Sequence, residues 1–266
     1  CLYDRNLRGG PTAWTSSVNH LLKPLHADLA ILVAFDVPSP SLFKPKYIWR
    51  IPEPSGEWDS VLDELYKSHN WSNQIKRREN IWGGLRHTNS VIHGSGTIIF
   101  ALRWWLLKFL DKIDESLYDM VIVTRNDHLY ACNHPALPMF FPNGVVSMPA
   151  DENYGGVTDR HTIFKWTERR RVLSVLPWLI KNDYRLRHIS EPEKALFIYY
   201  KEVGLNIQYI KRSFFTVRRK NDTTRWHWSF GPNQCTPGIY IKYENELISV
   251  RRFCNNTHIC PLYIQN

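Results

Sequence analysis

The stretch that decides the fold of this chain is residues 118–130, which read YDMVIVTRNDHLY. Residues 120–123 are apolar and mostly β-branched, so they predict a short buried strand. The sequence then turns abruptly polar at Arg125, Asn126 and Asp127. Loops at the carboxyl ends of strands carry the ligand-binding side chains of many α/β proteins. We therefore expect a functional site directly after this strand.

Strand and helix patterns alternate around that stretch. Residues 27–35, ADLAILVAF, form a second apolar run that is typical of a strand buried in a parallel sheet. A basic turn and a predicted helix over residues 14–25 precede it, which gives a strand, helix, strand opening. Further helices are predicted over residues 95–113 and 191–203, and late strands follow. This alternation predicts an α/β fold with an open, mostly parallel sheet flanked by helices.

The expected organisation is a single domain. We expect residues 1–220 to form the catalytic unit, with a nucleotide-binding half over residues 1–130 and an acceptor half over residues 131–220. The remaining segment, residues 221–266, is polar and aromatic with little periodicity. It is predicted to be an irregular extension packed on the same domain.

The charge and composition of the chain limit the classes of binding partner that are expected. The formal net charge of +9 favours an anionic partner, and a diphosphate, an anionic membrane surface or a nucleic acid would each fit. No nucleic-acid motif and no GxxxxGK[ST] loop is present, so nucleic acid is not an expected partner and a phosphotransferase is disfavoured. No apolar run reaches the roughly 18 to 20 residues of a membrane span, and no signal segment opens the chain. We expect a soluble domain, trimmed of a preceding strand or anchor.

Five cysteines occur without a CxxC pair, so no zinc site is indicated. Cys254 and Cys260 are close enough in sequence to close a small loop by a disulfide. Three Asn-X-Ser/Thr sequons, at Asn70, Asn221 and Asn255, matter only if the chain enters a secretory lumen.

A second polar motif follows the strand predicted at residues 145–148. It reads Gly155-Gly156-Val157-Thr158-Asp159-Arg160. Together with the Arg125-Asn126-Asp127 turn, it resembles the strand-and-turn motifs of GT-A-type nucleotide-sugar glycosyltransferases. Small viral and algal sugar transferases, including those that decorate chlorovirus capsid glycans, are the nearest kind of resemblance. The similarity extends over residues 1–218 and is strongest over residues 118–159.

The resemblance implies a set of site residues. Asp127 would hold a divalent cation, Mn²⁺ or Mg²⁺, that stabilises the departing diphosphate. Asp159 would be the base that takes the acceptor proton, with Glu193 and Asp151 as rivals. The expected donor contacts are Arg5, Arg8, Asp36, Arg125, Asn126, Gly155, Gly156 and Arg160. The family often has Asp-x-Asp where this chain has a single carboxylate, so a metal-independent enzyme that neutralises the diphosphate with arginines is the alternative.

The functional expectation is transfer of a sugar, with a pentose such as xylose among the candidates, from a nucleoside-diphosphate sugar to a glycan or glycoprotein. UDP is the expected nucleotide, and inversion at the anomeric carbon is expected. The alternatives are a non-catalytic carbohydrate- or protein-binding module and a basic nucleic-acid-binding protein. Location stays open between the cytoplasm, including that of a virus-infected cell, and a Golgi-type lumen.

Overall fold

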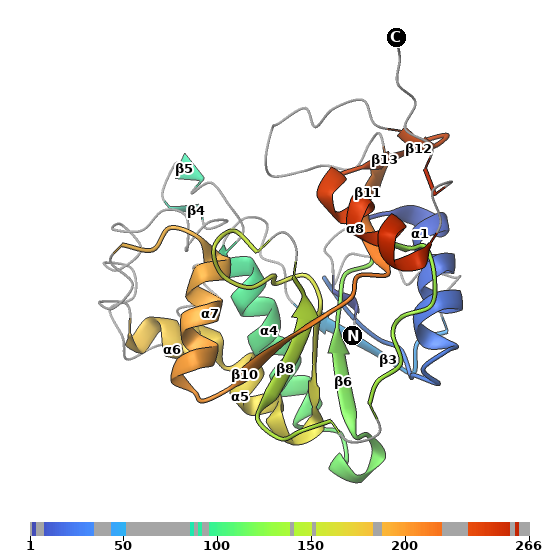
Figure 1. The fold of residues 1–266 in the computed structure, drawn as a ribbon. Coiled ribbons are helices and arrows are strands. Elements are labelled where there is room, and N and C mark those ends of the chain that lie inside the picture. Colours follow the sequence, from blue (N-terminus) through green and yellow to red (C-terminus); the bar gives the residue numbers. More distant parts are fainter. Residues whose placement is uncertain are drawn as a thin grey trace.

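Three small sheets and the helices packed against them make up the fold (Figure 1). The computed structural model describes residues 2–3, 8–34, 44–51, 86–87, 90–91, 96–138, 141–150, 153–182, 188–219, 234–255 and 259–260. The short elements are the 3-10 helices η2 (Glu115–Leu117) and η3 (Trp166–Glu168) and the paired strands β4 (Arg86–His87) and β5 (Ser90–Val91).

The first sheet is parallel, with strand order β1-β2-β3. Its strands are β1 (Leu2–Tyr3), β2 (Ala30–Ala34) and β3 (Tyr47–Ile51). Helix α1 (Gly10–Ser17), continued by the π-helical η1 (Val18–Leu22), connects β1 to β2. The expected strand, helix, strand opening is therefore confirmed, and the apolar run of β2 is buried as expected.

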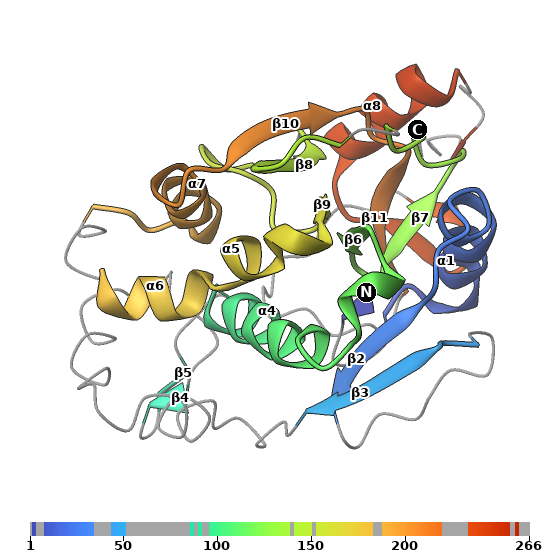
Figure 2. The same cartoon turned by 90° about the horizontal axis from the view of Figure 1, so that it is seen from below.

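The second sheet has the order β10-β8-β9-β6 and mixed directions. Its strands are β6 (Met120–Val123), β8 (Val145–Pro149), β9 (Thr162–Lys165) and β10 (Asn206–Ile210). Helices α4 (Gly96–Leu110), α5 (Arg169–Leu173), α6 (Val175–Lys181) and α7 (Pro192–Glu202) gather on one side of it (Figure 2). Their apolar side chains share the largest buried core with this sheet.

The third sheet is antiparallel, with the order β12-β13-β11-β7. It consists of β7 (His128–Tyr130), β11 (Phe214–Arg219), β12 (Gln234–Thr236) and β13 (Ile239–Ile241). Helix α8 (Glu244–Cys254) packs on it and shares a second core that includes Val217, Leu247 and Val250. The prediction of an irregular extension after residue 220 was therefore wrong where the structure describes that segment.

The prediction of one open, mostly parallel sheet was also wrong. The described strands are divided among three small sheets and the two-stranded β4–β5 pair, and most neighbouring pairs are antiparallel. Strand β9 returns between β8 and β6 in the opposite direction, and β7 pairs with β11 instead of extending the sheet of β6. An apolar run indicates that a strand is buried, but it carries no information on the strand's partner or direction.

Two disulfides tie the C-terminal part of the chain to the rest. Cys132 after β7 is bonded to Cys254 at the end of α8, and Cys235 in β12 is bonded to Cys260. The predicted pairing of Cys254 with Cys260 was wrong, because each of these cysteines has a different partner. Within the described residues, no helix combines the length and apolar character needed to cross a bilayer.

Candidate functional site

The turn between β6 and β7 places Arg125 and Asp127 at the centre of the site. The Val217 amide of β11 donates to the Asp127 carbonyl at 2.8 Å, which fixes the turn from one side. Gly9, before α1, packs against it from the other side. A Cβ on Gly9 would lie 2.8 Å from the Asp127 Cα, and Gly9 has a φ of 81°, so the position requires glycine. This close approach brings Arg8 beside the turn.

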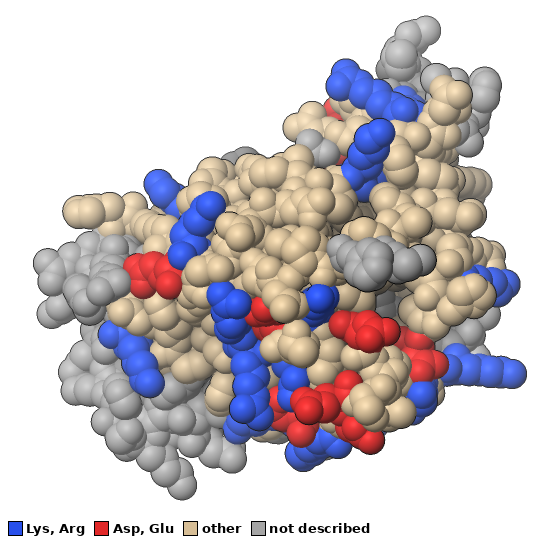
Figure 3. All heavy atoms as spheres, turned by 60° about the horizontal axis from the view of Figure 1, so that its bottom comes forward, with Lys and Arg blue, Asp and Glu red and all other residues tan. Residues whose placement is uncertain are grey.

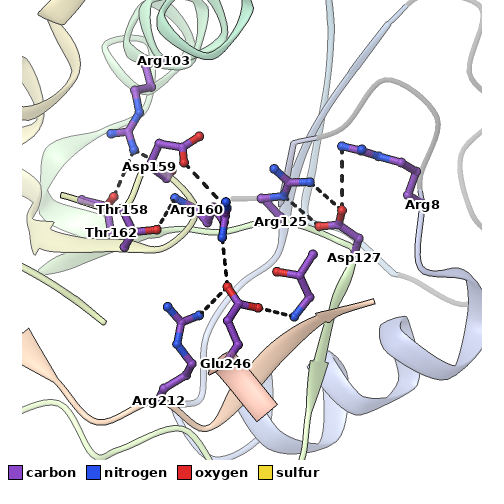
Figure 4. Close-up of polar contacts among 11 residues, drawn as sticks. Arg8, Arg103, Arg125, Asp127, Thr158, Asp159, Arg160, Thr162, Arg212 and Glu246 are labelled. Atoms are coloured by element: carbon purple, nitrogen blue, oxygen red, sulfur yellow. Dashed lines mark hydrogen bonds and ion pairs between the residues drawn. The ribbon is translucent and has the colours of Figure 1, made fainter. Parts of the chain in front are cut away.

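Asp127 is a buried carboxylate held by two arginines. Arg125 donates from Nε to Oδ1 at 2.8 Å and from Nη2 to Oδ2 at 2.6 Å, and Arg8 Nη2 lies 3.8 Å from Oδ2 (Figure 4). Burial alone would raise the pKa of Asp127, but the charges of Arg125 and Arg8 outweigh burial and hold the pKa well below its usual range. Asp127 is therefore an anion that orients the guanidinium groups around it.

The donor set around Asp127 does not fit a divalent cation. Mn²⁺ and Mg²⁺ prefer several oxygen ligands, whereas both carboxylate oxygens of Asp127 accept hydrogen bonds from Arg125. Nowhere in the described part of the chain do three or more His, Cys, Asp or Glu side chains form a group that could hold a metal ion.

Lys242 adds a further basic side chain to this cluster. It follows β13, and its backbone amide donates to the Thr216 carbonyl of β11 at 2.9 Å. Burial lowers the pKa of the Lys242 ammonium to about 7, and the charge of Arg125 lowers it in the same direction, while Asp127 opposes them. Cations therefore dominate the local field, which is what a site for an anionic ligand requires.

Arg160 is held by residues of the C-terminal segment. Its Nη1 donates to Glu246 Oε1 at 3.1 Å, and its guanidinium carbon lies 4.0 Å from the centroid of the Tyr243 ring. Glu246 is fully buried and also accepts from Arg212 Nη1 at 3.0 Å and from the Thr216 amide at 2.6 Å. Burial would raise the pKa of Glu246, but Arg212 and Arg160 outweigh it and lower the pKa. Helix α8 thus sets the position of Arg160.

Two buried acidic residues that interact electrostatically, Asp159 and Glu193, are called the carboxylate pair here. Asp159 Oδ1 lies 4.0 Å from Arg160 Nε, and both residues are buried. Glu193 lies in the first turn of α7. Its burial, together with the negative charge of Asp159, raises the pKa of Glu193 to about 8, so it carries a proton at neutral pH. One member of the pair is ion-paired and the other is protonated, an arrangement suited to acid–base work.

The backbone of this pair is rigidly supported. Arg103 of α4, itself 1% exposed, donates from Nη2 to the Asp159 carbonyl at 2.9 Å and to Thr162 Oγ1 at 3.1 Å. A Cβ on Gly156 would lie 2.1 Å from the Glu193 carbonyl oxygen, so the missing side chain of Gly156 makes room for the start of α7. Gly155 has no atom within 4 Å of where its Cβ would be.

Three buried histidines lie in one hydrogen-bonded chain behind the site. His134 Nδ1 donates to the Pro135 carbonyl at 2.7 Å, so its Nε2 accepts from His161 Nε2 at 3.1 Å. His161 Nδ1 then accepts from the Thr124 hydroxyl, which in turn accepts from His128 Nδ1, each at 3.0 Å. Burial lowers the pKa of all three imidazoles. Neutral histidines therefore join β7 and the loop after it to Thr124, which follows β6, and to His161, which directly precedes β9.

The basic triplet at residues 169–171 has a different role. Arg169 and Arg170 both pair with Asp111, at 2.9 and 3.3 Å, and Arg171 donates to the Val203 carbonyl at the end of α7 at 2.6 Å. On the face shown in Figure 3, basic and acidic side chains lie next to one another. Among the described residues on that face, acidic side chains border the basic ones, whereas a nucleic-acid interface is expected to carry a basic stripe.

All nine predicted site residues that lie in the described part of the chain come together. The residues assembled are Arg8, Arg125, Asn126, Asp127, Gly155, Gly156, Asp159, Arg160 and Glu193. Asn126 is buried beneath the turn, and neither of its amide atoms has a hydrogen-bond partner among the described residues. Arg5, Asp36 and Asp151 lie outside the described residues.

Sequence reasoning missed the contribution of the C-terminal segment. The residues it did not identify are Arg212, Lys242, Tyr243 and Glu246. The one available signal was the run Lys242-Tyr243-Glu244-Asn245-Glu246, whose carboxylates favour a helix N-terminus. No protein-family model matches this sequence, and no curated protein sequence matches it significantly.

Proposed function

We propose that this chain is a glycosyltransferase that moves a sugar from a nucleoside-diphosphate sugar to a glycan acceptor. The observation that carries the proposal is a cluster of cations directly beside a carboxylate pair. The cations are Arg8, Arg125, Arg160 and Lys242. The pair is Asp159 with Glu193, and one of the cations, Arg160, lies beside Asp159.

The cation cluster is the proposed diphosphate site. Guanidinium groups match phosphate oxygens in pairs of parallel hydrogen bonds, and Asp127 holds Arg125 in a fixed orientation. An incoming diphosphate would face more positive than negative charge there. The donor we propose is a UDP-sugar, with a pentose such as xylose among the candidate sugars. Because the residues around Asp127 do not fit a metal ion, no step of the proposal depends on one.

The carboxylate pair is the proposed acid–base centre. The acceptor hydroxyl oxygen forms a bond to the anomeric carbon while Asp159 takes the hydroxyl proton. The bond between that carbon and the diphosphate oxygen breaks, and its electron pair stays on the diphosphate, where Arg125 and Lys242 stabilise it. Protonated Glu193 donates a hydrogen bond to the bound substrate. Direct attack by the acceptor inverts the anomeric configuration.

The disulfides favour one of the two locations considered. Disulfides persist in oxidising compartments and are rare in the cytosol. The bonds between Cys132 and Cys254 and between Cys235 and Cys260 therefore support a Golgi-type lumen, where glycan and glycoprotein acceptors are found.

The test is a transfer assay with a panel of nucleotide sugars and glycans, each run with EDTA and with Mn²⁺. We expect release of nucleoside diphosphate with one donor class, and we expect Asp159→Asn to abolish release without weakening donor binding. Asp119→Asn is the matched control, because Asp119 is exposed and precedes β6, whereas the Arg125 turn follows the other end of that strand. Binding of saccharides without transfer by any donor would favour the binding-module alternative. Equal turnover by wild type and Asp159→Asn would refute the assignment of the base.

A further inference from the structure

Tyr154 occupies an unusual turn at the edge of the site. The Gly156 amide donates to the Asn153 carbonyl at 2.7 Å, which closes a four-residue turn. The two central residues, Tyr154 and Gly155, both have positive φ, 45° and 78°. This is the pattern of a type I′ turn, whose central positions favour Gly, Asn and Asp. A tyrosine at the first central position is unusual.

The strained conformation is fixed by its surroundings. A left-handed backbone costs a non-glycine residue about 1 kcal/mol or more, and such residues cluster at functional sites. Gly156 is packed against the start of α7, and the Val157 amide donates to the Glu193 carbonyl at 3.1 Å. On the other side, Asn153 Nδ2 donates to the Ala150 carbonyl at 2.9 Å. The turn therefore presents Tyr154 on a rigid support that is built on the same α7 turn as Glu193.

The Tyr154 ring lies in solvent beside the acid–base centre. The residue is 48% exposed, whereas Tyr199 and Tyr200 of α7 are buried. The Arg160 guanidinium carbon lies 5.9 Å from the Tyr154 ring centroid, and the same guanidinium lies beside Asp159. An exposed, large aromatic ring next to a carboxylate pair is a surface on which a ligand ring can pack.

We propose that Tyr154 is the platform on which a sugar ring of the acceptor stacks. One face of a sugar ring is lined by C–H groups, and such a face packs against the electron-rich face of an aromatic ring. A sugar placed there would lie near Asp159, which takes the hydroxyl proton in the proposed reaction. The role of this sugar as the acceptor rests on the proposed function, whereas the stacking of a saccharide on Tyr154 does not.

The test measures saccharide binding without any donor, by saturation-transfer NMR and titration with free oligosaccharides. We expect Tyr154→Ala to weaken saccharide binding about three- to tenfold, and Tyr154→Phe to retain it, because the ring and not the hydroxyl carries the stacking. Tyr209→Ala is the matched control, since Tyr209 is 50% exposed and lies on β10, a strand that contributes none of the named site residues. It should bind saccharides as the wild type does.

Two further measurements separate this inference from the proposed function. Tyr154→Gly removes the ring and relieves the left-handed backbone, so it should unfold no more easily than wild type while losing saccharide binding. Uridine binding should be unchanged in Tyr154→Ala. The proposal that Tyr154 is a stacking platform would be refuted if Tyr154→Ala and Tyr154→Gly bound saccharides with wild-type affinity. It would also be refuted if these variants lost uridine binding instead. Saccharide binding that depends on Tyr154, in a protein that transfers no sugar, would support the platform and refute the proposed function.

Discussion

Replacing Glu246 with glutamine should destabilise the protein strongly, because two buried arginines depend on its charge. Glu246 has 0% exposure and accepts from Arg160 at 3.1 Å and from Arg212 at 3.0 Å. Removing one partner of a buried ion pair costs about 3–5 kcal/mol. The amide oxygen of glutamine can still accept a hydrogen bond from the Thr216 amide, so we expect a loss of unfolding free energy at the lower end of this range, about 3 kcal/mol. For a chain of this size, that corresponds to a fall in Tm of roughly 6–12 °C.

The assay is urea and thermal unfolding of Glu246→Gln beside Glu244→Gln. Glu244 lies in the first turn of the same helix but is exposed, so its replacement should change the free energy of unfolding by less than about 0.5 kcal/mol. If Glu246→Gln unfolds within about 1 kcal/mol of the wild type, Glu246 does not neutralise the buried arginines, and the support assigned to α8 is wrong.

Three other predictions follow from the same structure. Gly156→Ala should unfold much more easily than wild type in a thermal melt, because the new Cβ would lie 2.1 Å from the Glu193 carbonyl oxygen; an unchanged Tm would contradict that packing. Stability should fall as pH drops from 6.5 towards 4, because the folded chain holds the pKa of His128 at about 3 and of His134 at about 4, so these two imidazoles take up protons more readily in the unfolded chain over that range. Denaturant titrations at several pH values test this, and a flat profile would refute it. Between pH 8 and 10, above the range in which folded Glu193 loses its proton, stability should rise, since the unfolded chain binds the Lys242 proton more tightly than the folded chain; Lys242→Met should lack this rise.

The local elements of the fold were predictable from the sequence, whereas the sheet topology was not. The apolar runs identified β2 and β6, and the predicted helices over residues 95–113 and 191–203 correspond to α4 and α7. Strand direction depends on long-range pairing, as in β9, which enters between β8 and β6. Short apolar strands of one composition suit both directions, so periodicity could not distinguish the antiparallel arrangement from a parallel sheet.

The site was predictable where its residues are neighbours in sequence. Arg125 and Asp127 are two residues apart on one turn, and Asp159 and Arg160 are adjacent. Glu246 is 86 residues from Arg160, and nothing local to either residue indicates their contact. The predicted disulfide pairing was wrong for the same reason, since Cys132 is bonded to a cysteine 122 residues away. The partner of a buried charged residue can be predicted only when the fold is known.

The measurement that tests the central claim most directly is calorimetric titration of UDP and GDP in EDTA, into wild type and Lys242→Met. Lys242→Met removes a half-buried amine whose pKa is lowered to about 7, so the variant should fold at least as stably as wild type at neutral pH. We predict that the wild type binds one of the two nucleotides without metal and that Lys242→Met binds it about tenfold more weakly. Equal affinity in the two proteins, or no binding until Mn²⁺ is added, would contradict a diphosphate site built from Arg8, Arg125 and Lys242.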